Sequence, residues 1–251
     1  MSKKDYGSKG RVGVATPQAN PTVEPEFAAC LPPGVSMLVT RLVSGCFEPK
    51  DRYREYFENL DTTLNSYDTL KLDAFAFACT AASYLVGLDR EVREIGALSR
   101  KRGYPIITGG QAIIAALKAL GVKKVAAGAP YPTWVLDMCK TYYEAAGFEI
   151  VSMTQIKIAS ADTRAIYELS AEDAIAALKG MDTAGADCIL FTGSGMPSLR
   201  AIQEGQKLKS LPVLSTNLCM AWALCEQLGL ARWGQGDHKL LNGWQDRIGL
   251  L

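Results

Sequence analysis

The chain has 251 residues, of which 48% are hydrophobic and 21% charged, and its formal net charge is +1. This length is typical of one large domain or two small ones, and so small a net charge gives no bulk electrostatic reason to bind nucleic acid or an anionic membrane. No apolar run reaches the roughly 18 to 20 residues that span a bilayer. Residues 1–11 are polar and basic, unlike a secretory signal. We therefore expect a cytoplasmic protein, with residues 1–10 as a disordered leader.

Cysteine and histidine usage narrows the possible chemistry. The seven cysteines are scattered and include no C-x-x-C pair, so they predict neither a disulfide framework nor a zinc site. His238 is the single histidine, which excludes metal sites that need two histidines. We expect any proton chemistry to use cysteine, tyrosine or carboxylate groups, without a metal.

From residue 11 onward, apolar runs rich in β-forming residues alternate with amphipathic stretches. This alternation predicts parallel sheets built from right-handed βαβ units. The runs expected as strands are 11–16, 36–43, 73–79, 104–108, 124–128, 149–153, 187–192 and 213–215. The stretches expected as helices are 52–71, 87–102, 110–120, 134–146, 171–178 and 217–228.

A faint internal repeat divides the chain into two halves. RVGVATPQANPTVEPEF and LDAFAFACTAASYLVG in the first half correspond to KKVAAGAPYPTWVLDMC and ADCILFTGSGMPSLRAI in the second, about 110 to 115 positions later. We assign residues 11–115 together with 217–251 to one α/β half, and residues 116–216 to the other. Ligands of open parallel sheets bind at the carboxyl ends of the strands, so we expect the site between the halves.

Cys79 is the first candidate for chemistry, because it ends an apolar strand and opens the next helix in ACTAAS. Unpaired N–H groups and the helix dipole lower the pKa of a thiol at such a position, which would make a reactive thiolate or a proton donor. The alternative is a buried structural cysteine. Four loops that follow strands should converge around it, and these are 17–22, 79–83, 130–133 and 193–198.

Other polar residues in these loops have two interpretations each. The loop TGSGMPS at 192–198 is either an anion cradle of backbone N–H groups or an ordinary turn. Tyr131, between two prolines, either offers its hydroxyl to a carboxylate or packs. Asn20 is either a site residue or a turn former, and Arg41 either faces a dianionic substrate or is an edge charge. The polar stretch 162–164 has the same ambiguity. Neither a Walker A motif nor a G-x-G-x-x-G after the first strand is present, so no nucleotide cofactor is expected.

Together, PQANPTVEPE, ACTAASYLVG, ALKALGVKKVAAGAPYPTWV and ILFTGSGMPSL resemble the aspartate/glutamate racemase superfamily, over about residues 11 to 230. The branch they resemble most is that of maleate cis–trans isomerase and arylmalonate decarboxylase. The resemblance implies two pseudo-symmetric Rossmann-like halves, no cofactor, and an interface site that handles a proton next to a carboxylate. It also implies a cysteine on each face of the substrate in racemases and maleate isomerases. Cys79 occupies the first of these positions, and Gly193 stands at the second.

One thiol suffices for decarboxylation followed by a single protonation. We therefore predict a cofactor-independent decarboxylase of an aryl- or alkylmalonate-type diacid. Thr80, Tyr131 and the N–H groups of Ser194 and Gly195 would hold the enediolate, and Cys79 would protonate the α-carbon. The resemblance places the single cysteine of arylmalonate decarboxylases at the opposite position, which implies a product of the opposite hand. Further residues expected to contact the carboxylate substrate are Pro17, Gln18, Asn20, Arg41 and Gly193.

Two alternatives remain open. Asn20 and Arg41 resemble the maleate isomerase pattern, although Thr163 stands where isomerases carry an asparagine. A maleate-type isomerase or racemase of a small dicarboxylate is therefore the first alternative, with Cys79 adding to the substrate and Tyr131 or water as proton partner. A non-catalytic protein that binds a small carboxylate is the second. Two further sets of residues have open roles. Phe47, Leu85, Met153 and Met196 either line an apolar pocket or belong to the core. Trp222, Trp233 and Trp244 either pack on the first half or contact another subunit of a homo-oligomer.

Overall fold

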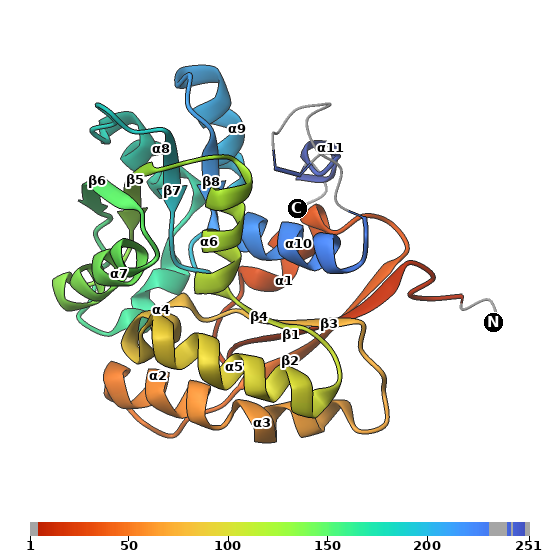
Figure 1. The fold of residues 1–251 in the computed structure, drawn as a ribbon. Helices are drawn as coiled ribbons and strands as arrows, with labels where there is room; N and C mark the ends of the chain where they lie inside the picture. The colour runs from red at the N-terminus through yellow and green to blue at the C-terminus, as the bar shows by residue number, and fades with distance from the viewer. Residues whose placement is uncertain (1–4, 231–239, 242, 249–251) are drawn as a thin grey trace.

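The computed structural model describes residues 5–230, 240–241 and 243–248, which form two parallel four-stranded sheets flanked by helices (Figure 1). The strand order is β2-β1-β3-β4 in the first sheet and β6-β5-β7-β8 in the second. Identical orders in the two halves agree with the internal repeat of the sequence. The predicted α/β class with two similar halves is confirmed.

Each of the eight apolar runs contains a strand. The central strands of each sheet are almost entirely buried, as expected when helices cover both faces of a parallel sheet. The first sheet consists of β1 (Gly10–Pro17), β2 (Val35–Leu42), β3 (Ala74–Phe77) and β4 (Ile106–Thr108). The second consists of β5 (Lys124–Ala129), β6 (Glu149–Gln155), β7 (Cys188–Phe191) and β8 (Val213–Ser215).

The strand register places the loops 17–22 and 79–83 together at the carboxyl edge of the first sheet, and the loops 130–133 and 193–198 together at that of the second. Ala15 pairs with Phe77, so the chain leaves β1 and β3 at nearly the same level. Gly128 pairs with Phe191 in the same way at the ends of β5 and β7. The four loops at these ends are therefore neighbours within their own halves.

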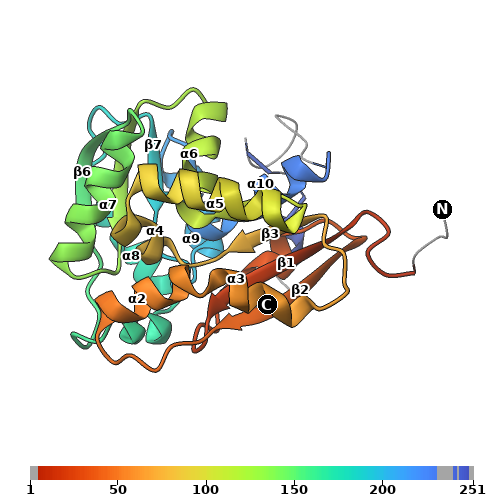
Figure 2. The ribbon, with the colours of Figure 1, turned by 60° about the horizontal axis from the view of Figure 1, so that its bottom comes forward.

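Helices cover both faces of the first sheet, with α1 and α10 on one side and α2, α3 and α5 on the other (Figures 1 and 2). Local signals explain several boundaries: Gly103 ends α5 in the left-handed conformation that glycine adopts readily, and the Thr108 hydroxyl caps α6 by accepting a hydrogen bond from the Gln111 N–H. The main helices are α1 (Val23–Cys30), α2 (Pro49–Glu58), α4 (Thr80–Val86), α5 (Leu88–Arg102), α6 (Gly109–Ala119), α7 (Thr133–Ala145), α8 (Ala171–Gly180), α9 (Leu199–Leu208) and α10 (Thr216–Gln227).

The expectation of one helix over 52–71 is wrong. The chain forms α2, then α3 (Leu60–Thr63) and the 3-10 helix η1 (Leu64–Tyr67). The break lies at Asn59, whose backbone leaves the α-helical region, and Asp68 then adopts a positive φ of 46° that no helix can continue. The helices α1 and α9 were not among the predicted stretches.

The C-terminal part of the chain returns to the first half. Helix α10 contacts α6, α1, β3 and β4 of that half and also β8 of the second sheet, and α11 (Gln245–Ile248) contacts α1 and α9. The Arg247 guanidinium donates to the carbonyls of Ala29 and Cys30 at 2.5 and 3.2 Å. Trp222 and Trp244 are buried, whereas Trp233, His238 and residues 1–4 lie outside the described residues. No helix in the described part of the chain is long and apolar enough to cross a membrane.

Candidate active site

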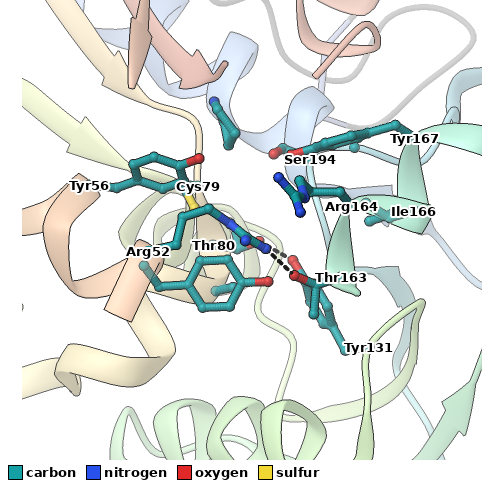
Figure 3. A pocket seen from close by; sticks show the side chains of 14 residues that line it. Arg52, Tyr56, Cys79, Thr80, Tyr131, Thr163, Arg164, Ile166, Tyr167 and Ser194 are labelled. Carbon is teal, nitrogen blue, oxygen red and sulfur yellow. Dashed lines mark hydrogen bonds between the residues drawn. The ribbon is translucent and has the colours of Figure 1, made fainter. Parts of the chain in front are cut away.

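One small pocket collects residues from all four loops and from both halves of the molecule (Figure 3). Its volume is about 30 Å³, which is room for about two water molecules. The predicted site residues in its lining are Pro17, Cys79, Thr80, Tyr131, Ser194 and Gly195.

Cys79 lies at the junction of β3 and α4, where it is the N-cap residue, and is 4% exposed. The sequence predicted a lowered pKa, and this prediction is wrong. Burial raises the pKa of the thiol to about 12, against the lowering effects of the Ala82 and Ala81 N–H groups and the Arg52 charge. Removal from water disfavours the thiolate more than these groups stabilise it. The thiol is therefore neutral at pH 7.

Two hydroxyl groups meet across the interface of the halves. Thr80 Oγ1, in the first turn of α4, lies 3.0 Å from Tyr131 Oη. Tyr131 follows β5 and is fixed between two prolines, the second of which is the N-cap of α7. Burial raises the pKa of Tyr131 well above its usual value, so its hydroxyl is a neutral hydrogen-bond donor at physiological pH.

Gly193, at the position where a second cysteine was considered, has a backbone conformation that favours glycine. Its φ is +115°, and a Cβ built there would lie 3.2 Å from Tyr131 Oη. Its N–H donates to Thr216 Oγ1 at 3.1 Å. A side chain at this position would thus be strained and would crowd the tyrosine.

The polar side chains of Asn20 and Thr22, in the loop after β1, form hydrogen bonds to the loop after β7 and do not line the pocket. Asn20 Nδ2 donates to Ser194 Oγ at 3.3 Å, and Ser194 Oγ donates to the Ala78 carbonyl at 2.8 Å. Thr22 Oγ1 donates to the Gly195 carbonyl at 2.8 Å. The Ser194 hydroxyl is therefore engaged in fixing the loop.

Glu26, in α1, adds buried hydrogen bonds between the segment after β1 and the residues that follow the glycine-rich loop. Its carboxylate is buried and accepts hydrogen bonds from the N–H groups of Ser198 and Leu199 and from Asn217 Nδ2. Asn217 Nδ2 also donates to the Ser194 carbonyl at 3.1 Å. Burial raises the pKa of Glu26. The motif PQANPTVEPE thus connects α1 to α9 and α10 and positions the glycine-rich loop.

Four predicted site residues are absent from the pocket lining: Gln18, Asn20, Arg41 and Gly193. Arg41, with a side chain 40% exposed, forms an ion pair of 2.6 Å with Glu24 and donates to the Asn20 carbonyl. Gln18 is exposed, and its Oε1 accepts from the Ser44 N–H at 2.8 Å. The expectation that Arg41 and Gln18 face the substrate is therefore not met in this arrangement, because each side chain turns toward a neighbouring loop or helix.

Six of the 14 residues that line the pocket were not predicted as site residues. Arg52, a residue of α2 that is 3% exposed, donates to the Phe47 carbonyl at 2.8 Å and to Thr163 Oγ1 at 2.9 Å. The sequence did carry a signal, since RYREY places an arginine and two tyrosines on one face of α2. The wall residues that were missed are Arg52, Tyr53 and Tyr56 of α2, Ile166 and Tyr167 of the 3-10 helix η2 (Thr163–Glu168), and Ala81 of α4. Thr163 and Arg164, whose role was left open, also line the pocket.

The apolar residues considered for the pocket lie elsewhere. Phe47 is 71% exposed, Met196 is buried in the core, and Leu85 and Met153 pack against the core. The pocket wall instead combines two arginines and several hydroxyl-bearing side chains with apolar surface, four of the lining residues being tyrosines. Among the described residues, no cluster of three or more histidine, cysteine, aspartate or glutamate side chains could hold a metal ion.

Residues 12–241 match the arylmalonate decarboxylase family, and the chain belongs to it. It is 25% identical to the maleate isomerase of Geobacillus stearothermophilus over 93% of this chain and 97% of that protein. It is 24% identical to the maleate isomerase of Pseudomonas putida, with the same shares covered. The resemblance to maleate isomerases and arylmalonate decarboxylases is confirmed. The chain belongs to a family of isomerases and decarboxylases.

Solved structures share this fold. The maleate isomerase Iso from Pseudomonas putida S16 superposes with a TM-score of 0.84 at 24% identity, covering 94% of this chain and 99% of that one. Arylmalonate decarboxylase superposes with a TM-score of 0.77 at 18% identity, covering 94% and 99%.

Proposed function

We propose that the protein is a cis–trans isomerase of a small unsaturated dicarboxylate of the maleate class, and that Cys79 adds reversibly to the double bond. The observation that carries this proposal is the single thiol in a small, polar pocket that also contains two guanidinium groups, those of Arg52 and Arg164. The relatives named maleate isomerase, 24 to 25% identical over nearly the whole chain, support the same activity.

The dimensions and polarity of the pocket favour a slender dianion. The pocket is small, with a volume of about 30 Å³, and a four-carbon diacid needs less room than an arylmalonate does. The residues expected to accommodate an apolar side group lie outside the pocket. The guanidinium groups of Arg52 and Arg164 line it, and their positive charge suits a substrate with two carboxylates.

The reaction begins with the Cys79 thiol. Sγ forms a bond to one alkene carbon while the π electron pair moves to the other carbon and into its carboxylate. The resulting enediolate accepts hydrogen bonds from the hydroxyls of Thr80 and Tyr131. The thiol proton passes to the enediolate oxygen as negative charge builds there. It returns to sulfur when the adduct is expelled.

Rotation then requires no second thiol. Addition leaves a single bond between the two central carbons, so the substituted half can turn before the C–S bond breaks and the trans alkene is released. Gly193 in place of a second cysteine is compatible with this sequence of steps. The proposed C–S bond has a counterpart in a similar protein, because a cysteine-to-serine variant of Nocardia farcinica maleate cis–trans isomerase holds a covalently bound succinylcysteine intermediate. That adduct also carries a proton on the neighbouring carbon, so deuterium on carbon distinguishes the two routes.

Proton NMR in deuterated buffer tests the proposal. We expect maleate to become fumarate, without deuterium on carbon, because no carbon is protonated in the proposed steps. A Cys79→Ala variant should not convert it. A parallel sample contains a disubstituted arylmalonate, which should stay unchanged. If maleate stays unchanged instead, the isomerase proposal fails.

A decarboxylase of malonate-type diacids is the second candidate, and one observation favours it. The neutral thiol of Cys79, with a pKa of about 12, is a proton source next to the hydroxyl pair of Thr80 and Tyr131, and protonation of an enediolate needs such a group. Loss of carbon dioxide from the arylmalonate, with deuterium at the α-carbon of the product, would support this candidate. If neither sample changes, a non-catalytic carboxylate-binding protein is favoured.

A further inference from the structure

We infer that Arg52 and Arg164, which both pair with Asp162, form a second carboxylate-binding subsite, distinct from the hydroxyl pair of Thr80 and Tyr131. It would bind the carboxylate remote from the carbon that Cys79 attacks, and would select dicarboxylates over monocarboxylates of the same size. This inference deepens the proposed function and depends on it for the substrate class.

The position of Arg52 is the first argument. The residue projects from α2 toward Thr163 and is almost fully buried beside Cys79 (Figure 3). Its hydrogen bonds to the Phe47 carbonyl and Thr163 Oγ1 use part of its five N–H donors. A guanidinium group fixed in this way presents a rigid, planar donor set that suits a carboxylate.

The charge balance is the second argument. Asp162 forms ion pairs with both arginines, at 3.5 Å from Arg52 Nη2 and 2.6 Å from Arg164 Nη2. The Arg164 contacts and the nearby Arg52 charge hold the pKa of Asp162 below its usual value, so it is ionised. Two guanidinium groups therefore share one carboxylate, which leaves this cluster with a net charge of about +1. The Arg52 side chain is buried, and buried charges are normally paired, so a substrate carboxylate would complete the pairing.

The surroundings of Arg164 are the third argument. Its guanidinium lies over the ring of Phe47, 5.4 Å from the centroid, while Arg164 also lines the pocket. The pocket wall on this side contains the rings of Tyr53, Tyr56 and Tyr167. Tyrosine rings displace water, and a charge pair in a partly dehydrated site is stronger than one in bulk solvent.

A purely structural role for the cluster makes a different prediction. Arg52 also connects α2 to η2, so its removal would lower stability in either case. A structural clamp would not discriminate between ligands of equal size and different charge. Ligand preference is therefore the quantity to measure.

The experiment follows the protection of Cys79 from iodoacetamide at pH 9, in a Cys46→Ala background that removes the more exposed thiol. Succinate and succinamate are the two probes, since they have the same length and differ by one negative charge. We expect succinate to protect at a concentration at least about tenfold lower than succinamate, the factor that corresponds to about 1.4 kcal/mol. Arg52→Met and Arg164→Met should remove most of this preference.

The matched control is Arg54→Met on the same helix. Arg54 is exposed and pairs with Asp51, so its loss should leave the preference unchanged. The Arg164→Met variant keeps the test informative if the Arg52 variant unfolds, because the Arg164 side chain is 40% exposed and its loss should perturb the fold less. Equal protection by both probes in the parent protein, or an unchanged preference in both folded variants, would overturn the subsite.

This outcome is independent of turnover. A protein that prefers succinate through Arg52 and Arg164 but does not convert maleate would uphold the subsite and contradict the isomerase. A protein that converts maleate but binds both probes equally would uphold the isomerase and contradict the subsite.

Discussion

Thr80 Oγ1 lies 3.0 Å from Tyr131 Oη, and this contact joins the end of β3 in one half to the end of β5 in the other. Both hydroxyls face the pocket that contains Cys79. The donors that would stabilise an enediolate therefore come from both repeats of the sequence. Catalysis accordingly depends on how the two halves are held together.

Removal of either hydroxyl should slow the reaction without unfolding the protein. We expect Thr80→Val and Tyr131→Phe each to lower kcat/KM for maleate by about 10²-fold, the usual effect of losing one oxyanion donor. Because the two groups hydrogen-bond to each other, the double variant should lose less than the product of the two effects. Tyr104→Phe, outside the pocket, is the control. Fully multiplicative losses would show that the hydroxyls act independently.

The reactivity of Cys79 toward iodoacetamide should increase steeply with pH. The thiolate is the reactive form, and burial raises the pKa to about 12, so the thiolate fraction increases about tenfold per pH unit up to that value. In the Cys46→Ala background, the alkylation rate should still rise above pH 9, where an ordinary thiol levels off. A plateau below pH 8 would contradict the buried environment.

Gly193 should resist substitution. Gly193→Ala places a Cβ at a φ of +115° and 3.2 Å from Tyr131 Oη, and we expect it to lower the free energy of unfolding by about 1 to 3 kcal/mol. Gly180→Ala is the matched control, because Gly180 ends α8 with open space around its Cα. Urea unfolding measures both. Equal stabilities of the two variants would show that the backbone at Gly193 relaxes freely.

Glu26 should contribute far more stability than its neighbour Glu24. Glu26→Ala leaves buried N–H donors of Ser198 and Leu199 and the Asn217 amide without their acceptor, which costs about 1 to 3 kcal/mol. Glu24, on the same helix, forms a half-exposed ion pair with Arg41, so Glu24→Ala should cost less than about 1 kcal/mol. Thermal unfolding of both variants checks this. A similar loss in each would contradict the account of PQANPTVEPE as an internal attachment.

The sequence predicted the strands well because buried parallel strands are continuous apolar runs, as in β3 and β7. The four converging loops followed from the same regularity. Cys79 and Tyr131 were singled out because they follow strands, whereas Thr80 entered with the mechanism that the family resemblance implied. A residue's place at the end of a strand can be read directly from the order of residues along the chain.

Tertiary properties were not predictable in this way. Arg52 is buried because η2 packs over it from more than a hundred residues away, and the local sequence around Arg52 does not contain this contact. The pKa of Cys79 depends on how completely the surrounding side chains exclude water, which local helix position does not determine. Arg41 turns to Glu24 of α1, a helix that the sequence analysis did not predict.

The most direct test of the central claim compares the parent protein with Cys79→Ala in the conversion of maleate to fumarate, followed by proton NMR. If Cys79 forms the covalent adduct, the variant should lose at least about 10³-fold in rate while keeping its fold, as is typical when a nucleophile is removed. Conversion by the variant at the rate of the parent would contradict the claim that this thiol performs the chemistry.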